Sequence, residues 1–173
     1  PLFLYNYPKS TQFNIAVETI RQLVSHPNIF GIKDSSGNLE YLDKVAVLSK
    51  EMGFNFLIGP EELLIETLDK GVHGGVHGGS NLFPSLFTEL FLAAKNKEDI
   101  KIVQLNTMVA KLSAGVYAVE GGANSYLKGI KAAACTLGLC KNVLLPPLSA
   151  ANNTVVAEIQ HTIEAVQTEL KTI

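Results

Sequence analysis

The sequence predicts an α/β protein: the C-terminal half of a TIM-type (β/α)8 barrel, followed by a helical C-terminal extension. Three observations support this fold class. Short β-rich runs alternate with helical patterns over the first part of the chain, and the rest of the chain has helical patterns only. The third observation is length, because 173 residues are too few for a closed barrel, which typically needs about 250.

The alternation defines about four βα units. The β-rich runs lie at about 2–5, 29–32, 55–58 and 74–77, and the helical patterns between them lie at about 12–24, 39–52 and 61–69. Strands that are joined through helices run parallel in a sheet. Four such strands do not close a barrel, and a doubly wound sheet usually has one more strand, so half a barrel fits this pattern best.

The second part of the chain has only helical patterns, at about 84–95, 98–116, 123–138 and 153–172, with "LLPPLSA" at 144–150 as a break. Pro60 before two glutamates, and Pro84, mark helix starts. We therefore expect barrel βα units over residues 1–96 and a helical region over 97–173 that packs on the barrel. The N-terminal half of the barrel is expected to be missing, and an open half barrel would expose Leu2, Leu4, Ile58 and Val76.

Composition excludes several classes of function. The chain is 47% hydrophobic and 17% charged, with 14 basic and 16 acidic side chains and no basic run, so nucleic acid is not an expected partner. No apolar run reaches membrane-spanning length, so no membrane partner is expected either. Cys135 and Cys140 lie five residues apart in a helical pattern, which is poor geometry for a disulfide. We expect a reducing, cytoplasmic setting.

A single lysine follows the second predicted strand, in "NIFGIKDSSGN" at residues 28–38. Tyr5, at the end of the first strand, should lie beside Lys33, because adjacent parallel strands are about 4.8 Å apart. Both would lie at the carboxyl ends of their strands, where barrel enzymes place their chemistry. An amine set among Ile29, Phe30 and Ile32 would be neutral in part, so Lys33 could attack a ketone while Tyr5 moves protons. The alternative is that Lys33 is simply the first solvated residue after a strand.

Other polar residues have plainer interpretations beside the functional ones. His73 and His77 do not share a helical face, so no metal site is expected, and His77 is expected to line the pocket. Ser35, Ser36 and Asn38 are typical turn residues. Ser80 and Asn81 either donate to a carboxylate or cap the helix at Pro84. Glu120 either faces the substrate or ends a helix.

Several motifs together resemble a known family of enzymes. "LYNYP" at 4–8, "GIKDSSGN" at 31–38, "GGVHGGSNLFP" at 74–84, "GIKAAACTLGL" at 129–139 and "LLPPLSA" at 144–150 are similar to the second half of the dihydrodipicolinate synthase and N-acetylneuraminate lyase family. The resemblance covers nearly the whole chain. It implies a pyruvate-dependent class I aldolase on a TIM barrel, which is a tetramer and uses no cofactor or metal.

The resemblance also assigns roles to residues. It implies that Lys33 forms the imine and that Tyr5 shuttles protons. It places the backbone around Val76 against bound pyruvate, so the segment Val76, His77, Gly78, Gly79 and Ser80 is expected to bind substrate. The threonine-rich loop that holds the pyruvate carboxylate, and a tyrosine from a neighbouring subunit, belong to the missing first half.

The substrate within this family is less sharply indicated. Synthases of the family generally carry an arginine two residues past the proline of the tyrosine motif, and here that position is Ser10, preceded by Lys9. "YNYP", "KD" and "GSN" resemble more closely the aldolases of 2-keto-3-deoxy sugar acids. The alternatives are dihydrodipicolinate synthase, N-acetylneuraminate lyase, a catalytically inactive binding protein on the same scaffold, and a phosphate-binding α/β protein that uses the glycines at 74–79.

Overall fold

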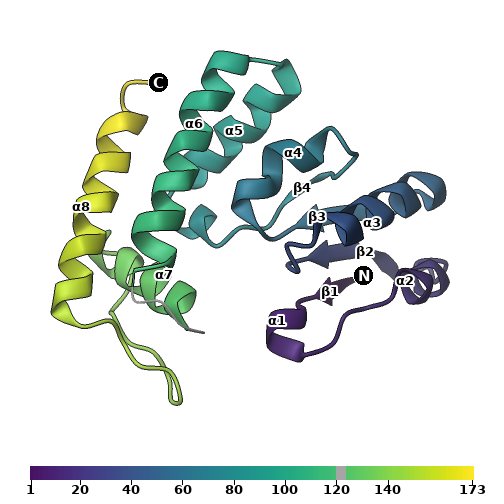
Figure 1. The fold of residues 1–173 in the computed structure, drawn as a ribbon, viewed down its shortest axis with the longest axis horizontal. Coiled ribbons are helices and arrows are strands. Elements are labelled where there is room, and N and C mark those ends of the chain that lie inside the picture. The colour runs from purple at the N-terminus through teal and green to yellow at the C-terminus, as the bar shows by residue number, and fades with distance from the viewer. Residues whose placement is uncertain (120–123) are drawn as a thin grey trace. The chain divides into compact units, whose positions relative to one another are not determined.

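The computed structural model describes residues 1–119 and 124–173. The chain forms two compact units, Pro1–His77 and Gly78–Ile173, and each is described by itself (Figure 1). The expected division after residue 96 concerns the units of a complete barrel and stays a prediction. No helix within the described ranges is long and apolar enough to cross a membrane.

The first unit contains a parallel sheet of four strands in the order β1-β2-β3-β4. The strands are β1 (Leu2–Asn6), β2 (Ile29–Asp34), β3 (Asn55–Ile58) and β4 (Gly74–Gly75). Each pairs in parallel with the next, which confirms the predicted βα alternation. The fourth strand is shorter than the expected run at 74–77.

Helices connect these strands: α1 (Pro8–Thr11) and α2 (Val17–Leu23), then α3 (Leu39–Met52), then the 3₁₀ turn η1 (Glu61–Leu63) that leads into α4 (Leu64–Leu68). The first connection differs from the expected helix at 12–24. Gln12 has a left-handed φ of 57°, which ends α1, and Ala16 is extended, so α2 begins only at Val17. Pro8 starts α1, because proline suits the first turn of a helix.

The core of this unit lies between the sheet and its helices (Figure 1). Ile32, Phe56 and Ile58 project from the strands onto Leu42 and Val45 of α3. The expectation that Ile58 and Leu4 would be exposed is therefore wrong: Ile58 is buried, and Leu4 packs against the same core. Successive residues of a strand point to opposite faces, so these residues face the helices and their chain neighbours face away.

The other face of the sheet is open in part. Phe3, Tyr5 and Val76 project there and are each about half exposed, and Leu2 at the edge is also exposed, as expected. Gly31 lies opposite Phe3 in the strand register. A Cβ at Gly31 would lie 2.1 Å from the backbone carbonyl oxygen of Asn55 and 2.8 Å from the Phe3 ring, so only glycine fits at this position of β2.

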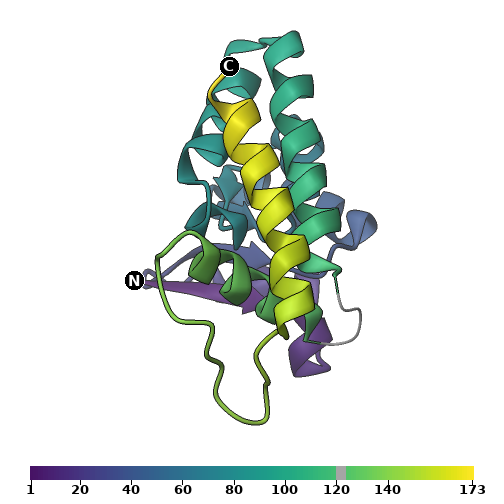
Figure 2. The same ribbon diagram turned by 90° about the vertical axis from the view of Figure 1, so that its left-hand side faces the viewer.

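The second unit is helical. It contains the 3₁₀ turn η2 (Gly79–Asn81), α5 (Pro84–Asn96), α6 (Asp99–Leu112), the π turn η3 (Ser113–Tyr117), α7 (Ser125–Thr136) and α8 (Asn153–Leu170). Figures 1 and 2 show α6 beside both α5 and α8, and α7 packs on η3 and α8. The segment 144–150 lies outside any helix between α7 and α8, as expected.

The buried side chains of this unit recur at helical spacing, which is why the sequence pattern identified these helices. The α8 stripe is buried at Val155, Ile159, Ile163 and Val166. The helix α8 packs against α7, α6 and η3, and the buried residues of α6 are Leu105, Met108, Val109 and Leu112. The close contact continues past α6, because a side chain at Gly115 would lie 2.3 Å from the Thr162 hydroxyl of α8.

Candidate active site

Lys33 and Tyr5 are direct partners in the register of β2 and β1. The Lys33 ammonium lies 4.7 Å from the centroid of the Tyr5 ring, a distance at which a cation is attracted to an aromatic face. Each residue is followed by one last strand residue, so both lie at the carboxyl ends of their strands. The expectation that Lys33 and Tyr5 lie side by side is confirmed by this contact, whereas their chemical roles stay predictions.

The surroundings of Lys33 differ from the expected apolar set. Strand alternation turns Ile32 to the opposite face from Lys33, and Phe30 lies where the register with β1 shifts and is half exposed. The strand neighbours on the face of Lys33 are Tyr5 and Leu57, and the lysine itself is half-buried.

Ser35 links the turn after Lys33 to the phenol. Its Oγ donates to the Tyr5 Oη over 3.3 Å, and its backbone N–H donates to the carbonyl of Asn6 over 2.8 Å. Gly59, just after β3, leaves the space that Ser35 fills, because a Cβ there would lie 2.0 Å from the Ser35 Oγ. The turn residue Ser35 therefore touches a proposed catalytic group, which its sequence pattern did not indicate.

Ser36 and Asn38 have the turn roles that were expected. The Ser36 Oγ and N–H both donate to the Asp34 carboxylate, at 2.8 and 3.1 Å. The Asn38 side chain accepts from the Tyr41 N–H over 3.0 Å and so caps α3.

Asn6 and Asp34, the last residues of β1 and β2, are polar and completely buried. They were not singled out from the sequence, although a polar residue directly after each proposed catalytic residue is a signal that could have found them. Burial raises the pKa of the Asp34 carboxyl, while hydrogen bonds from Asn6 and Ser36 act in the opposite direction.

Val76 and His77 follow β4. The Val76 N–H donates to the carbonyl of Ile58 over 2.8 Å, and its side chain is exposed. His77 is buried, with its Nδ1 2.9 Å from the carbonyl oxygen of Gly59. Because a carbonyl only accepts, the Nδ1 carries the proton. Burial lowers the pKa of His77, and the nearby charge of Lys33 adds to the lowering.

Gly78, Gly79 and Ser80 belong to the second unit, where they begin the turn η2. Ser80 and Asn81 do not cap α5 as one interpretation expected, since the N-cap position is Phe83. The Asn81 side chain instead donates to the carbonyl of Gly78 over 3.0 Å. The substrate-binding role of this segment stays a prediction, and Glu120 lies outside the described residues.

Metal ligation has no visible basis in the described ranges, where no group of three or more histidine, cysteine or carboxylate side chains is placed to hold an ion. His73 instead accepts at its Nδ1 from the Phe56 N–H over 3.1 Å.

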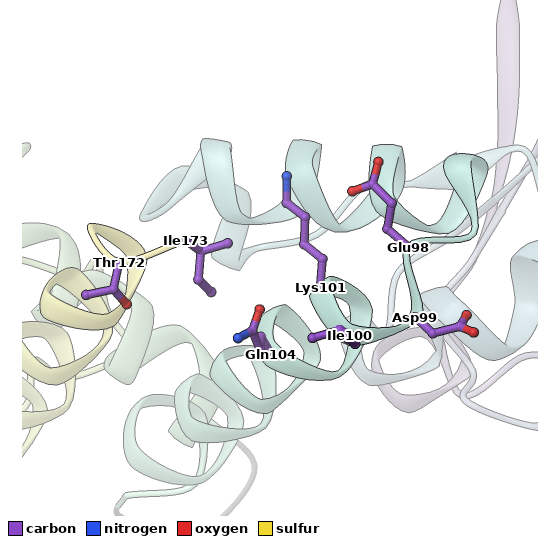
Figure 3. Close-up of a pocket in the computed structure, with 7 residues that line it drawn as sticks. All are labelled: Glu98, Asp99, Ile100, Lys101, Gln104, Thr172 and Ile173. Atoms are coloured by element: carbon purple, nitrogen blue, oxygen red, sulfur yellow. The ribbon is translucent and has the colours of Figure 1, made fainter.

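An open hollow of about 620 Å³ lies in the helical unit, between the start of α6 and the end of the chain (Figure 3). Its lining residues are Glu98, Asp99, Ile100, Lys101, Gln104, Thr172 and Ile173. The Lys101 ammonium pairs with Glu89 at 2.6 Å, so it is already neutralised. The hollow contains none of the strand-end residues, and we place the candidate chemistry at Lys33 and Tyr5 instead.

Comparisons with known proteins agree with the predicted fold, a fragment of a barrel with a helical C-terminal part. A 4-hydroxy-tetrahydrodipicolinate synthase of Listeria monocytogenes is 30% identical over 123 residues, which are 71% of this chain and 42% of that relative. The solved dihydrodipicolinate synthase of Bacteroides thetaiotaomicron matches with a TM-score of 0.88 and 38% identity, over 95% of this chain and 56% of that one. A prophage protein of the dihydrodipicolinic acid synthase family from E. coli K12, solved in complex with pyruvate, shares the fold with a TM-score of 0.85 at 23% identity, over 96% of this chain and 56% of that one.

The chain thus spans about half the length of the relatives it matches. The predicted fold class, a fragment of a TIM barrel with a helical C-terminal part, is confirmed by the parallel sheet and by the match to these structures. The family model described as "Dihydrodipicolinate synthetase family" matches the sequence over residues 1–166. This match covers most of the sequence, and the chain therefore belongs to the dihydrodipicolinate synthetase family.

Proposed function

We propose that this chain supplies the imine-forming lysine of a pyruvate-dependent aldolase, a lyase that cleaves a 2-keto-3-deoxy sugar acid or a related 2-oxo acid. The observation that carries the proposal is the contact of the Lys33 ammonium with the Tyr5 ring at the carboxyl ends of two adjacent parallel strands. The family membership supports it, and one member of that family was solved with pyruvate bound.

In this mechanism the neutral Lys33 amine attacks the ketone carbon of the substrate, and loss of water leaves a protonated imine. As the C3–C4 bond breaks, the proton of the C4 hydroxyl passes to the Tyr5 oxygen while the phenolic proton of Tyr5 moves on to water, and the electron pair of the bond moves into the imine to give an enamine. The aldehyde then departs. Tyr5 then donates its proton to the enamine carbon and regains one from water, and hydrolysis of the imine releases pyruvate and restores the Lys33 amine.

Ser35 is placed to assist the phenol. Its contact with the Tyr5 Oη would hold the phenol in one orientation while the proton moves. The same contact offers a second hydroxyl through which the proton can be passed.

The substrate class rests on the region after β1. Ser10 is exposed on α1 at the position where the synthases of the family generally carry an arginine, and Lys9 before it is also exposed. We therefore propose a 2-keto-3-deoxy sugar acid. Dihydrodipicolinate synthase is the second candidate, because the relatives named above carry that activity in their names. The remaining candidates are N-acetylneuraminate lyase and an inactive binding protein on the same scaffold, and the experiment below distinguishes them.

The decisive experiment is a substrate panel with the natural protein that carries this sequence. Pyruvate release from a 2-keto-3-deoxy sugar acid and from N-acetylneuraminate is compared with condensation of pyruvate and aspartate semialdehyde. Release from the sugar acid supports the proposal, and faster condensation supports the synthase. Lys33→Gln should abolish every activity, whereas Lys44→Gln, which removes an exposed ion pair with Glu40, should not change them.

We further propose that the 173-residue chain alone is inactive and that the complete enzyme is a tetramer. The support is the partly open sheet face with Phe3 and Val76, and the greater length of the relatives. The chain alone should associate strongly and cleave no substrate. A monodisperse monomer that cleaves a sugar acid at ordinary rates would contradict this proposal.

A further inference from the structure

Asn6 and Asp34 form a completely buried polar pair directly behind Tyr5 and Lys33. They are register partners, exactly as Tyr5 and Lys33 are, and lie one residue further along the same two strands. The Asn6 Nδ2 donates to the Asp34 Oδ1 over 2.6 Å. Because side chains alternate along a strand, this pair lies on the opposite face of the sheet from the proposed catalytic pair.

The remaining polar atoms of the pair are also hydrogen-bonded. The Asn6 Oδ1 accepts from the Ile15 N–H over 2.9 Å, and the Asn6 Nδ2 also donates to the Asn14 Oδ1 over 2.8 Å. The Asp34 Oδ2 accepts from the N–H and the Oγ of Ser36. A buried network whose members are all satisfied specifies a single arrangement, whereas removal of one member leaves the others unpaired.

This network joins three segments at one point: the end of β1, the end of β2 and the loop that replaces the expected helix at 12–16. The loop is held from its other side as well, because the Tyr41 Oη donates to the carbonyl of Ile15 over 2.8 Å. The ends of β1 and β2 therefore cannot shift against each other without breaking buried hydrogen bonds. Any such shift would move Tyr5 relative to Lys33.

We propose that Asn6 and Asp34 are positioning residues, whose side-chain pair keeps the Tyr5 phenol against the Lys33 amine. The inference rests on the proposed function. It assigns to the pair an effect on the proton-transfer steps, which need both Tyr5 and Lys33. Imine formation with pyruvate depends chiefly on Lys33, so it should be affected far less.

The first test uses the natural protein and separates these two steps. Asn6→Ala should lower kcat for carbon–carbon cleavage at least about tenfold, as expected when a general acid–base group is displaced. The fraction of protein that borohydride traps with pyruvate should stay within about twofold of the unchanged protein. The exchanged pair, Asn6→Asp with Asp34→Asn, restores a donor and an acceptor across the two strands and should recover most of the lost kcat. Parallel loss of kcat and trapping, or no loss of kcat, would overturn the proposal.

Ser49→Ala is the matched control for a merely structural effect. Ser49 is also buried, and its Oγ donates to the carbonyl of Phe54 over 2.7 Å at the end of α3, away from the strand ends. This variant should lower the free energy of unfolding, but it should not lower kcat more than it lowers the fraction of protein that borohydride traps with pyruvate. If Ser49→Ala lowered kcat as much as Asn6→Ala does while trapping stayed unchanged, loss of any buried polar group would have this effect. That result would overturn the assignment.

The second test does not depend on the reaction. The methylene and ammonium protons of Lys33 should show a ring-current shift in NMR spectra, because the ammonium lies over the Tyr5 ring. Tyr5→Leu should remove this shift and so assign it, and Tyr5→Phe should keep it. Asn6→Ala, or Asn6→Ser if the alanine variant does not fold, should reduce the shift, and an unchanged shift would overturn the proposal. If the unchanged protein traps no pyruvate but this shift responds as expected, the proposed function fails and the positioning inference survives.

Discussion

Gly59→Ala tests the packing that brings Ser35 to the Tyr5 phenol. The added Cβ would lie 2.0 Å from the Ser35 Oγ, 3.0 Å from the Ser35 Cβ and 3.3 Å from the carbonyl oxygen of Asp34. Rotation of the serine hydroxyl alone does not relieve the second and third contacts, so the turn after β2 must move. Overpacking of this kind typically costs about 1–3 kcal/mol, and loss of the 3.3 Å hydrogen bond to the half-exposed Tyr5 adds at most about 1 kcal/mol.

The same substitution should be nearly harmless in a Ser35→Gly background. Of these three contacts, the one with the Asp34 carbonyl at 3.3 Å then remains. Gly59 does not have a positive φ, so alanine there is not strained and should gain about 0.4–1 kcal/mol by restricting the unfolded chain. Urea unfolding of the four proteins of this double-mutant cycle, followed by circular dichroism, gives the coupling free energy. We expect coupling of about 1 kcal/mol or more, and an equal cost of Gly59→Ala in both backgrounds would show that Ser35 does not occupy the space beside Gly59.

Three further predictions concern Tyr5, His77 and two helix N-caps. Tyr5→Phe in the natural protein should lower turnover about 100-fold or more while pyruvate trapping persists, because only the proton shuttle is lost; unchanged turnover would remove Tyr5 from the mechanism. Because burial lowers the pKa of His77 below its ordinary 6.5, the unfolded chain binds the proton more readily. The stability contribution of His77 is therefore present above pH 6.5 and is lost as the pH falls through the folded pKa. His77→Asn should flatten that fall in urea unfolding measured at several pH values, and the same fall in the variant would contradict it. Asn38→Ala and Asn152→Ala each remove an N-cap, from α3 and α8, and should each cost about 1 kcal/mol by the same assay, so a loss below about 0.3 kcal/mol would argue against the caps.

Much of the fold could be predicted because helices and strands bury side chains at regular intervals along the sequence. The stripe that includes Ile159 and Ile163 on α8 identified that helix, and the alternation of β-rich and helical runs identified the parallel sheet. The meeting of Tyr5 and Lys33 followed from the same regularity, because each ends a strand and the strands are neighbours in the chain.

The errors arose where side chains far apart in the sequence decide the local structure. The segment 12–16 is a loop because the buried Asn6 binds the Ile15 N–H and the Asn14 side chain, and nothing in the loop itself shows this. The short apolar runs did not reveal which residues face the helices, so Leu4 and Ile58 were expected to be exposed although both pack in the core. The contact of Ser35 with Tyr5 depends on the space beside Gly59, on the next strand.

Trapping of the pyruvate imine shows directly whether Lys33 is the lysine that forms it. The natural protein is incubated with pyruvate and sodium borohydride, digested, and its peptides are mapped by mass spectrometry. We expect one reduced pyruvate adduct, on the peptide that contains Lys33, and none in the Lys33→Gln variant. An adduct on another lysine of a catalytically active protein, or activity without any adduct, would contradict this expectation.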